Sequence, residues 1–384
     1  MSNFFNILKI NVIITNKVRD EQLKVSRLRH FIFMEGSVMK AAVFKNSGLP
    51  LSIEQIEDPI PAPTDMVIKV CACGICGTDL HWSEINNEES GFRDIHPGAV
   101  MGHEFSGEIV EIGRNVKHDW RIGERVCAMP QIGCANCSDC IAGRPHRCSL
   151  ALNRATPGNP GAYSEFIRIG AKETFRLPDS VTFQEGALVE PLAVGLHAVK
   201  SAQITAGDDV LIVGAGPVGL SVAIWCKFFG ARHIIVSDLV AERAEKAGDF
   251  GATGFIDASI SNVPEAFEKI VGSWPSVIFD AVGVAGSMQL SIDYVSNYGK
   301  VVVVGLCMVS DRFEPATAVV KEVDIIFCFC YDRADFQMTL EMLAQERIDV
   351  KGLVTQSVGF EEFPEAFENL KRPSDQIKVM LEPN

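Results

Sequence analysis

The chain has 384 residues, which is more than one hydrophobic core usually supports and therefore indicates two domains. Hydrophobic residues make up 47% and charged residues 22%, as in globular enzymes. The net charge of −14 argues against nucleic acids and anionic membranes as partners, because both select basic patches. A run of 18 or more apolar residues is absent from the sequence, so no membrane-spanning helix is expected.

Cysteine usage indicates the compartment. The sequence has 12 cysteines and no pattern typical of a signal peptide. We therefore expect a cytoplasmic protein, in which reduced thiols serve metal binding or chemistry rather than disulfides.

Residues 1–38 differ from the rest of the chain because they are basic in an acidic protein. We expect a disordered extension or a misassigned start codon ahead of Met39. An amphipathic targeting segment is the alternative. The segment is left out of the fold prediction.

Short strands with glycine- and proline-rich turns dominate the first half of the chain. Strands are expected at residues 40–44, 66–71, 105–112 and 125–128. The pattern changes after about residue 192 and then alternates between strands and helices. Strands are expected at 209–213, 233–237, 255–256, 277–280 and 301–304, and helices at 220–229, 241–250, 264–271 and 287–295.

This alternation predicts βαβ units and a doubly wound parallel sheet of the Rossmann type, so the fold class is α/β. We expect a mostly β domain over residues 39–191 and the parallel-sheet domain over residues 192–332. Residues 333–384, with a helix at 336–345 and a strand at 377–381, show no further βαβ unit. They are expected to return to the first domain.

A glycine-rich turn follows the predicted strand 209–213 and opens the next helix. Residues 214–219 read G-A-G-P-V-G, a complete G-x-G-x-x-G motif. Glycines there allow a tight turn and close approach of the backbone to a pyrophosphate, which the helix N-terminus attracts. The predicted cofactor-binding residues of this turn are Gly214, Gly216, Pro217, Val218 and Gly219.

An acidic residue stands at the end of the next predicted strand. Asp238 lies 19 residues beyond Gly219, where a carboxylate accepts hydrogen bonds from the adenosine ribose. It would repel a 2′-phosphate, and Leu239 offers no cation, so the sequence favours NAD over NADP. Arg243 could still pair with a phosphate or cover the ribose. The alternative for Asp238 is a helix cap or a solvated loop residue.

Four cysteines within 15 residues form the clearest metal signal. Their spacing, C-x2-C-x2-C-x7-C, suits a tetrahedral Zn²⁺ site, and four thiolates leave no open position. The surrounding segment, about residues 130–150, has no hydrophobic period and would depend on metal for order. We therefore predict a structural zinc bound by Cys134, Cys137, Cys140 and Cys148.

A second set of polar residues is scattered through the first domain. Cysteine, histidine and glutamate are ligands that zinc accepts, and three protein ligands leave one position for water or substrate. These residues occur in G-I-C-G-T-D-L-H (74–81), in G-H-E (102–104) and before Pro191. The candidate residues are Cys76, Thr78, His81, His103, Glu104 and Glu190.

Five motifs in this order resemble the zinc-dependent branch of the medium-chain dehydrogenase/reductase family, the alcohol and polyol dehydrogenases. They are G-I-C-G-T-D-x-H, G-H-E-x-x-G, the cysteine quartet, E-P-L-A-V-G and G-A-G-P-V-G. The similarity covers roughly Met39 to the C-terminus. It implies a GroES-like catalytic domain beside a Rossmann domain, two zinc ions per chain and NAD.

The resemblance also implies roles for the scattered residues. Cys76 and His103 match the catalytic zinc ligands, and Glu104 matches an acid that binds this zinc directly or stands behind the ligands. Glu190 is predicted as a further ligand of this zinc, bound directly or standing behind the others. It matches the junction position, where polyol dehydrogenases carry glutamate and liver-type alcohol dehydrogenases carry cysteine.

A proton path is implied in the same way. Thr78 matches the hydroxyl that hydrogen-bonds the substrate alcohol. His81 matches the outer end of the proton relay.

The expected activity is hydride transfer between NAD and a secondary alcohol, polyol or sugar-derived substrate. An L-threonine 3-dehydrogenase-like activity and a non-catalytic zinc-scaffolded NAD-binding protein remain as alternatives. The family also implies a homodimer or homotetramer, for which the apolar run 323–329 is a candidate edge or simply a core strand. Residues that could face the substrate are Trp82, Asn153, Arg154, Tyr163 and Tyr331.

Overall fold

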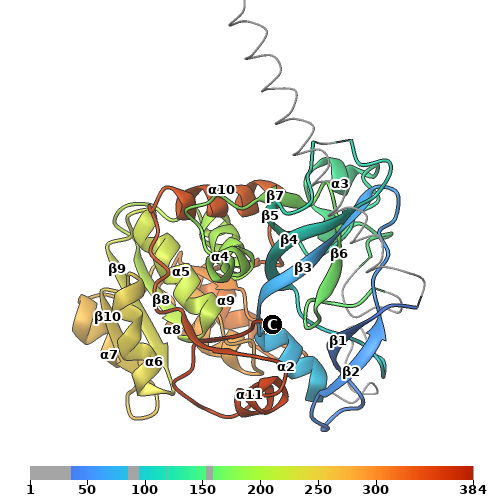
Figure 1. Cartoon of the computed structure of the whole chain (residues 1–384). Coiled ribbons are helices and arrows are strands. Elements are labelled where there is room, and N and C mark those ends of the chain that lie inside the picture. The colour runs from blue at the N-terminus through green and yellow to red at the C-terminus, as the bar shows by residue number, and fades with distance from the viewer. Residues whose placement is uncertain (1–35, 85–94, 118, 153–158, 384) are drawn as a thin grey trace, which may run out of the picture.

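A computed structural model describes residues 36–84, 95–117, 119–152 and 159–383 (Figure 1). Residues 1–35 of the expected extension, and the candidate pocket residues Asn153 and Arg154, lie outside this part of the chain. Within it, no helix combines the length and apolar character needed to cross a membrane.

A six-stranded, fully parallel sheet forms one half of the molecule. Its strand order is β10-β9-β8-β11-β12-β13, the doubly wound arrangement in which the strand order reverses beside β8. This confirms the predicted α/β class. The strands are β8 (Asp209–Val213), β9 (His233–Asp238), β10 (Gly254–Asp257), β11 (Val277–Asp280), β12 (Lys300–Val303) and β13 (Asp324–Phe327).

Helices cover both faces of this sheet (Figure 1). Side chains alternate along β8, so Val210 and Ile212 join the core on one face while Leu211 joins the core on the other. Such two-sided burial explains why these strands are short continuous apolar runs. The connecting helices are α5 (Pro217–Phe228), α6 (Ala241–Lys246), α7 (Val263–Val271), α8 (Ser287–Tyr294) and α9 (Pro315–Lys321), with a 3₁₀ turn at Ala247–Phe250 after α6.

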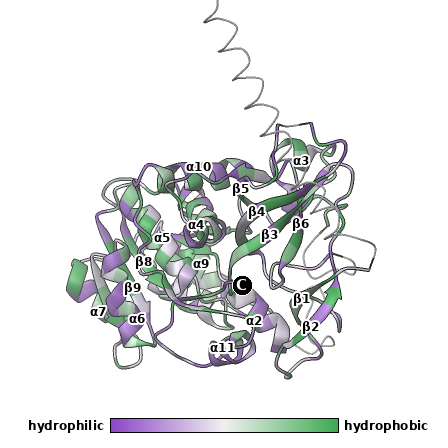
Figure 2. Cartoon of the chain, viewed as in Figure 1, coloured by the Kyte–Doolittle hydropathy of each residue, from purple (hydrophilic) through white to green (hydrophobic). Residues whose placement is uncertain are grey.

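A seven-stranded, mostly antiparallel sheet forms the other half, and its strands β3 and β4 are largely hydrophobic (Figure 2). The order is β14-β15-β3-β4-β5-β7, with β6 also pairing with β3, and a separate hairpin of β1 and β2. The strands are β1 (Val38–Val43), β2 (Ser52–Glu57), β3 (Asp65–Gly74), β4 (Glu104–Ile112), β5 (Arg125–Ala128), β6 (Phe166–Gly170), β7 (Thr174–Arg176), β14 (Val354–Val358) and β15 (Lys378–Leu381).

The C-terminal region contains a βαβ unit, so the prediction that it has none is wrong. Strand β14 pairs in parallel with β15, and α11 (Phe363–Asn369) lies between them in sequence. The strand β14 reads V-T-Q-S-V and exposes its middle residues Gln356 and Ser357, so it lacks an apolar run. The two strands extend the seven-stranded sheet because β15 also pairs with β3.

Two helices connect the halves. Helix α4 (Phe183–Ala202) packs on β4 and β3 on one side and on α5 on the other, and α10 (Arg333–Ala344) packs on α4. Thr182 and Glu185 form a capping box that fixes the start of α4. The expected boundary at residues 191/192 lies inside this helix, because Pro191 occupies its interior.

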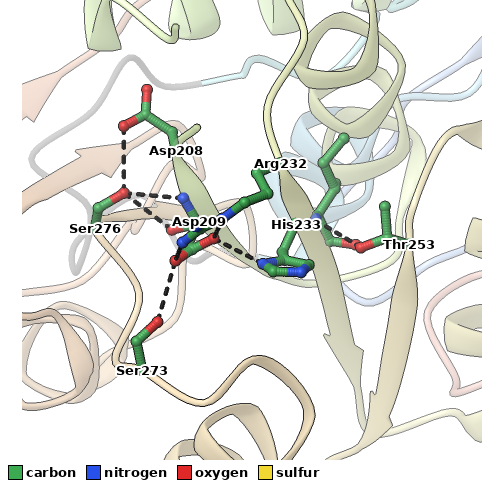
Figure 3. A network of polar contacts seen from close by, with 8 residues as sticks. Asp208, Asp209, Arg232, His233, Thr253, Ser273 and Ser276 are labelled. Carbon is green, nitrogen blue, oxygen red and sulfur yellow. Dashed lines mark hydrogen bonds and ion pairs between the residues drawn. The ribbon is translucent and has the colours of Figure 1, made fainter. Parts of the chain in front are cut away.

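A buried acid ties together the N-terminal ends of the parallel strands (Figure 3). Asp209 is 6% exposed and accepts hydrogen bonds from Arg232, from His233 Nδ1 at 2.8 Å and from Ser273 at 3.1 Å. Burial alone would raise the pKa of Asp209, but these partners outweigh it and hold the pKa below the ordinary value. The ionised form of Asp209 therefore stabilises the folded state.

We expect Asp209→Asn to lower the free energy of unfolding by about 1 to 3 kcal/mol at pH 7. A depressed carboxyl pKa contributes stability above the unfolded-state pKa, near 4, and this stability disappears as the pH falls through the folded-state pKa. Urea unfolding measured between pH 7 and pH 3 should therefore show the unfolding free energies of the original protein and of Asp209→Asn converging in acid. A constant gap across this range would contradict the assignment.

Candidate active site and metal centres

Three of the predicted catalytic-site residues converge where β3 ends and β4 begins. The ligand atoms of Cys76, His103 and Glu104 all lie within 4.8 Å of one another. Cys76 follows the end of β3, and His103 and Glu104 stand where the antiparallel partner β4 begins, so the pairing of Gly74 with Glu104 brings them together. A thiolate, an imidazole and a carboxylate at this spacing suit a catalytic zinc with an open position.

A buried acid, Asp79, sets the orientation of His103. Asp79 is fully buried, and its Oδ1 lies 3.4 Å from His103 Nδ1, which leaves Nε2 as the ring nitrogen available for a metal. The other Asp79 oxygen accepts a 2.6 Å hydrogen bond from the Tyr163 hydroxyl. Burial lowers the pKa of His103, but Asp79 and Cys76 outweigh it and raise that pKa well above its usual range.

Glu104 has a buried counter-ion that the sequence reading missed. Lys378 Nζ, on β15, lies 2.8 and 2.6 Å from the two oxygens of Glu104 and donates to the Ile75 carbonyl at 2.8 Å. Both side chains are almost completely buried. A lone lysine in the apolar run I-K-V-M-L was the available signal, because a buried ammonium requires an anion.

Glu190 lies outside the group of three but close to it. Its side chain projects from the buried face of α4, and burial together with the Glu104 charge raises the pKa of Glu190 to about 7. The hydroxyl of Tyr331 lies beside it, so the candidate pocket residue Tyr331 does reach the site. Tyr163, by contrast, is fully buried and engaged by Asp79.

Thr78 and His81 occupy the same short helix. Helix α2 (Gly77–Glu84) starts directly after Cys76, with Thr78 half-buried in its first turn. His81 and Trp82 lie one turn later, His81 exposed and Trp82 partly buried. The helix thus leads from the three-residue group to solvent.

The four cysteines of the quartet also converge. Their sulfur atoms lie within 4.8 Å of one another, as tetrahedral metal coordination requires. Backbone amides of Asn136 and Cys137 point at Cys134 and lower the pKa of its thiol to about 6, which favours the metal-binding thiolate. Residues 130–150, here called the cysteine lobe, contain only short helices, α3 (Ser138–Ile141) and a 3₁₀ turn at Pro145–Arg147.

The glycine turn has the shape that a dinucleotide needs. Gly214 has a φ of 103°, and a Cβ at Gly219 would strike the Gly214 carbonyl oxygen. A Cβ at Gly216 would meet nothing within 4 Å, so this position leaves open space in front of the N-terminus of α5. Pro217 and Val218 form the first turn of that helix and complete a cradle for a pyrophosphate.

Asp238 lies beside this turn. Its two oxygens accept hydrogen bonds from the amides of Ala215 at 2.7 Å and Val240 at 2.8 Å. Each carboxylate oxygen keeps a second lone pair that a ribose hydroxyl could use. A groove of about 580 Å³ opens next to it, lined in part by Leu239 and Val240. Arg243, on α6, has a buried Nε without a hydrogen-bond partner among the described residues.

A larger groove lies away from Cys76, His103 and Glu104. It has a volume of about 850 Å³ and runs between the cysteine lobe, β7 and α10, with Cys140, Glu173 and Arg333 among its lining residues. None of the three converging catalytic residues lines it. The chemistry therefore identifies the site, and the size of the groove does not.

Known families match both halves of the chain. Residues 62–179 match the alcohol dehydrogenase GroES-like domain, and residues 217–345 match the zinc-binding dehydrogenase family. The sorbitol dehydrogenase of Ovis aries is 35% identical over 334 residues, covering 86% of this chain and 93% of that relative.

Solved structures agree with these matches. The chain resembles 2R,3R-butanediol dehydrogenase from Bacillus subtilis with a TM-score of 0.78 and 32% identity, covering 90% of this chain and 100% of that one. A short chain alcohol dehydrogenase from Escherichia coli CFT073, solved in complex with NADH, has a TM-score of 0.80, 28% identity and coverages of 90% and 100%. The chain therefore belongs to the zinc-dependent medium-chain dehydrogenase/reductase family and is an alcohol or polyol dehydrogenase that uses zinc and NAD.

Proposed function

We propose that the substrate is a sugar alcohol of the sorbitol type, oxidised at a secondary hydroxyl. The observation that carries this proposal is the Glu190 carboxylate, which lies beside the group formed by Cys76, His103 and Glu104. In liver-type alcohol dehydrogenases, the position of Glu190 would hold a cysteine instead. A second acid next to the three ligands suits a substrate with several hydroxyl groups, because carboxylates accept hydrogen bonds from them. The similarity to sorbitol dehydrogenases supports the same class.

We assign the catalytic zinc to Cys76, His103 and Glu104, and the structural zinc to the cysteine quartet. Glu190 adds a further polar side chain beside the catalytic group. The donor types and their spacing fit this metal at both places. When bound, zinc would supply Lewis acidity toward the substrate hydroxyl and NAD would supply a hydride acceptor.

Residues of α2 would move the proton. The Thr78 hydroxyl would accept it near the zinc ligands and release its own proton outward toward His81, since Thr78 is half-buried in the first turn after Cys76. His81 is exposed on the same helix and passes the proton to solvent.

Asp238 is expected to select NAD over NADP. Replacement by alanine should lower kcat/KM for NAD by roughly 10- to 100-fold, because hydrogen bonds to a charged group contribute about 1.5 to 3 kcal/mol. The efficiency with NADP should change less, since the repulsion of its 2′-phosphate disappears. Steady-state kinetics with both cofactors measures the ratio.

Asp238→Asn serves as a partial control, because its amide oxygen can accept from the backbone amide of either Ala215 or Val240, whereas its NH2 group cannot accept from the other. Equal efficiency of the unchanged enzyme with NAD and NADP would contradict this role of Asp238.

We further propose a homodimer, or a tetramer built from it, that pairs the edges of two parallel sheets. Strand β13 is one of the two edge strands of this sheet. The apolar side chains of Phe327 on β13, and of Val319 and Val320 on the preceding helix α9, are more than two-thirds exposed. Large exposed apolar residues at one edge are typical of an interface. The twelve free thiols suit a reducing compartment, the cytoplasm.

The substrate class is tested by NAD reduction with sorbitol, an aldonate, threonine and 2-propanol, with zinc measured per chain. We expect about two zinc ions and the highest kcat/KM with sorbitol. Preference for threonine or the aldonate would overturn the substrate class. One zinc per chain without turnover would instead indicate a scaffold.

A further inference from the structure

The segment that joins β13 to α10, residues 328–332, brings a buried tyrosine to the catalytic group. Tyr331 is 1% exposed, and its ring lies 5.6 Å from that of Phe336. Its hydroxyl has no hydrogen-bond partner within standard geometry among the described residues, and the Glu190 carboxyl is its acidic neighbour. Tyr331 is therefore a buried neighbour of the Glu190 carboxyl whose hydroxyl no other described residue engages.

The backbone at this point needs support from its neighbours. Cys330, immediately before Tyr331, has a φ of 55°, in the left-handed region. A non-glycine residue adopts that region at a cost of about 1 kcal/mol or more. Such a conformation persists only where the surrounding structure fixes it.

The cysteine lobe supplies polar contacts on the C-terminal side of Tyr331. Arg144 Nε lies 3.1 Å from Asp332 Oδ1, and the Arg333 amide donates to the Gly143 carbonyl at 2.8 Å. Gly143 has a φ of 78°, and a Cβ on it would lie 3.1 Å from the Cβ of Arg333. The lobe and the start of α10 are thus in close backbone contact.

The lobe also contacts the N-terminal side of Tyr331, where the His146 ring meets the Phe329 ring edge-on at 5.9 Å. The lobe has little apolar core of its own, and its buried residues include Ile132, Pro145 and Cys148. Metal at the quartet must therefore supply much of the order that presents these contacts.

We propose that the cysteine lobe positions the catalytic site: by holding residues 329–333 it sets Tyr331 against Glu190, so that the structural metal site controls turnover. This inference rests on the proposed roles of the quartet and Glu190. Tyr331 is then a positioning residue, and Arg144 and His146 act through it.

The test combines changes at the lobe contact with a change at Tyr331 in the full-length, zinc-loaded enzyme. The double variant Arg144→Ala/His146→Ala alters side chains that touch residues 329–333 and leaves all four cysteines in place. We expect it to keep two zinc ions per chain and its KM for NAD, while kcat for sorbitol falls by about 3- to 30-fold. Ile141→Ala, a mostly exposed position of the same lobe, is the matched control and should keep the original kcat.

Tyr331→Phe removes only the hydroxyl and should lower kcat by a similar factor. When combined with the lobe variant, it should lower kcat no further than the slower parent does, because both changes act through one contact. The proposal would be overturned if the losses in kcat multiply in the combined variant, or if the lobe variant keeps its original kcat. If Glu190→Gln keeps full turnover, the proposed function of Glu190 fails instead, so the two failures are distinguishable.

Discussion

Replacing His103 with alanine is expected to remove the catalytic zinc and nearly abolish oxidation. Lewis-acid assistance contributes several kcal/mol, and a loss of about 4 kcal/mol corresponds to a roughly 10³-fold lower kcat. Cys76→Ser should act in the same direction, because its side chain belongs to the same group of three ligands. Zinc per chain should fall from about two to one in both variants.

Two comparisons make this result specific. NADH binding, followed by fluorescence, should be retained, because the glycine turn lies on the parallel sheet and shares no residue with the zinc ligands. Thr78→Ala should lower turnover while both zinc ions remain. Full turnover of the His103→Ala protein would show that the catalytic zinc site is wrongly assigned.

Replacing Lys378 with methionine is expected to have the largest effect on stability. Removing one member of a buried ion pair leaves the other charge uncompensated, at a cost of about 3 to 5 kcal/mol. Zinc-stripped protein should lose up to this amount, because Glu104 then has neither the ammonium nor a metal beside it, and only the His103 imidazole remains as a counter-charge. Zinc-loaded protein should lose less, since the metal takes the place of the ammonium as a counter-charge.

Urea unfolding with and without a chelator measures the difference. Lys246→Met is the matched control, because its ion pair with Asp375 is exposed and contributes about 0 to 1 kcal/mol. An equal loss in the stripped and loaded forms would mean that Glu104 does not approach the metal.

Five of the six strands of the parallel sheet could be predicted to within one residue at each end, whereas β13 and parts of the seven-stranded half could not. Strand β8 is a short apolar run followed by a glycine turn, so local sequence determines both strand and turn. Helix α4 was missed because Pro191 ordinarily ends a helix. There the packing on β4 and α5 outweighs the local signal. Strand β14 was missed because its order comes from pairing with β15.

The residues of the candidate site also fall into two groups, those that the sequence indicates and those that only the fold reveals. Cys76, His103 and the cysteine quartet stand in short motifs whose spacing already indicates metal, and the structure brings each set together. The functions of Asp79 and Lys378 depend on partners distant in sequence, 24 and 274 residues away. No local pattern links Asp79 to His103, so only the fold reveals these partners.

The return of the chain to the seven-stranded sheet has a consequence for the order of assembly. All strands of the parallel sheet lie between residues 209 and 327, so this half is complete while β15 is still to be synthesised. The Lys378 ammonium reaches the Ile75 carbonyl across 303 residues of sequence. Contacts of such long range form late because their loop-closure entropy is largest. A ribosome-bound chain should therefore acquire a dinucleotide cradle well before Glu104 gains its lysine counter-ion.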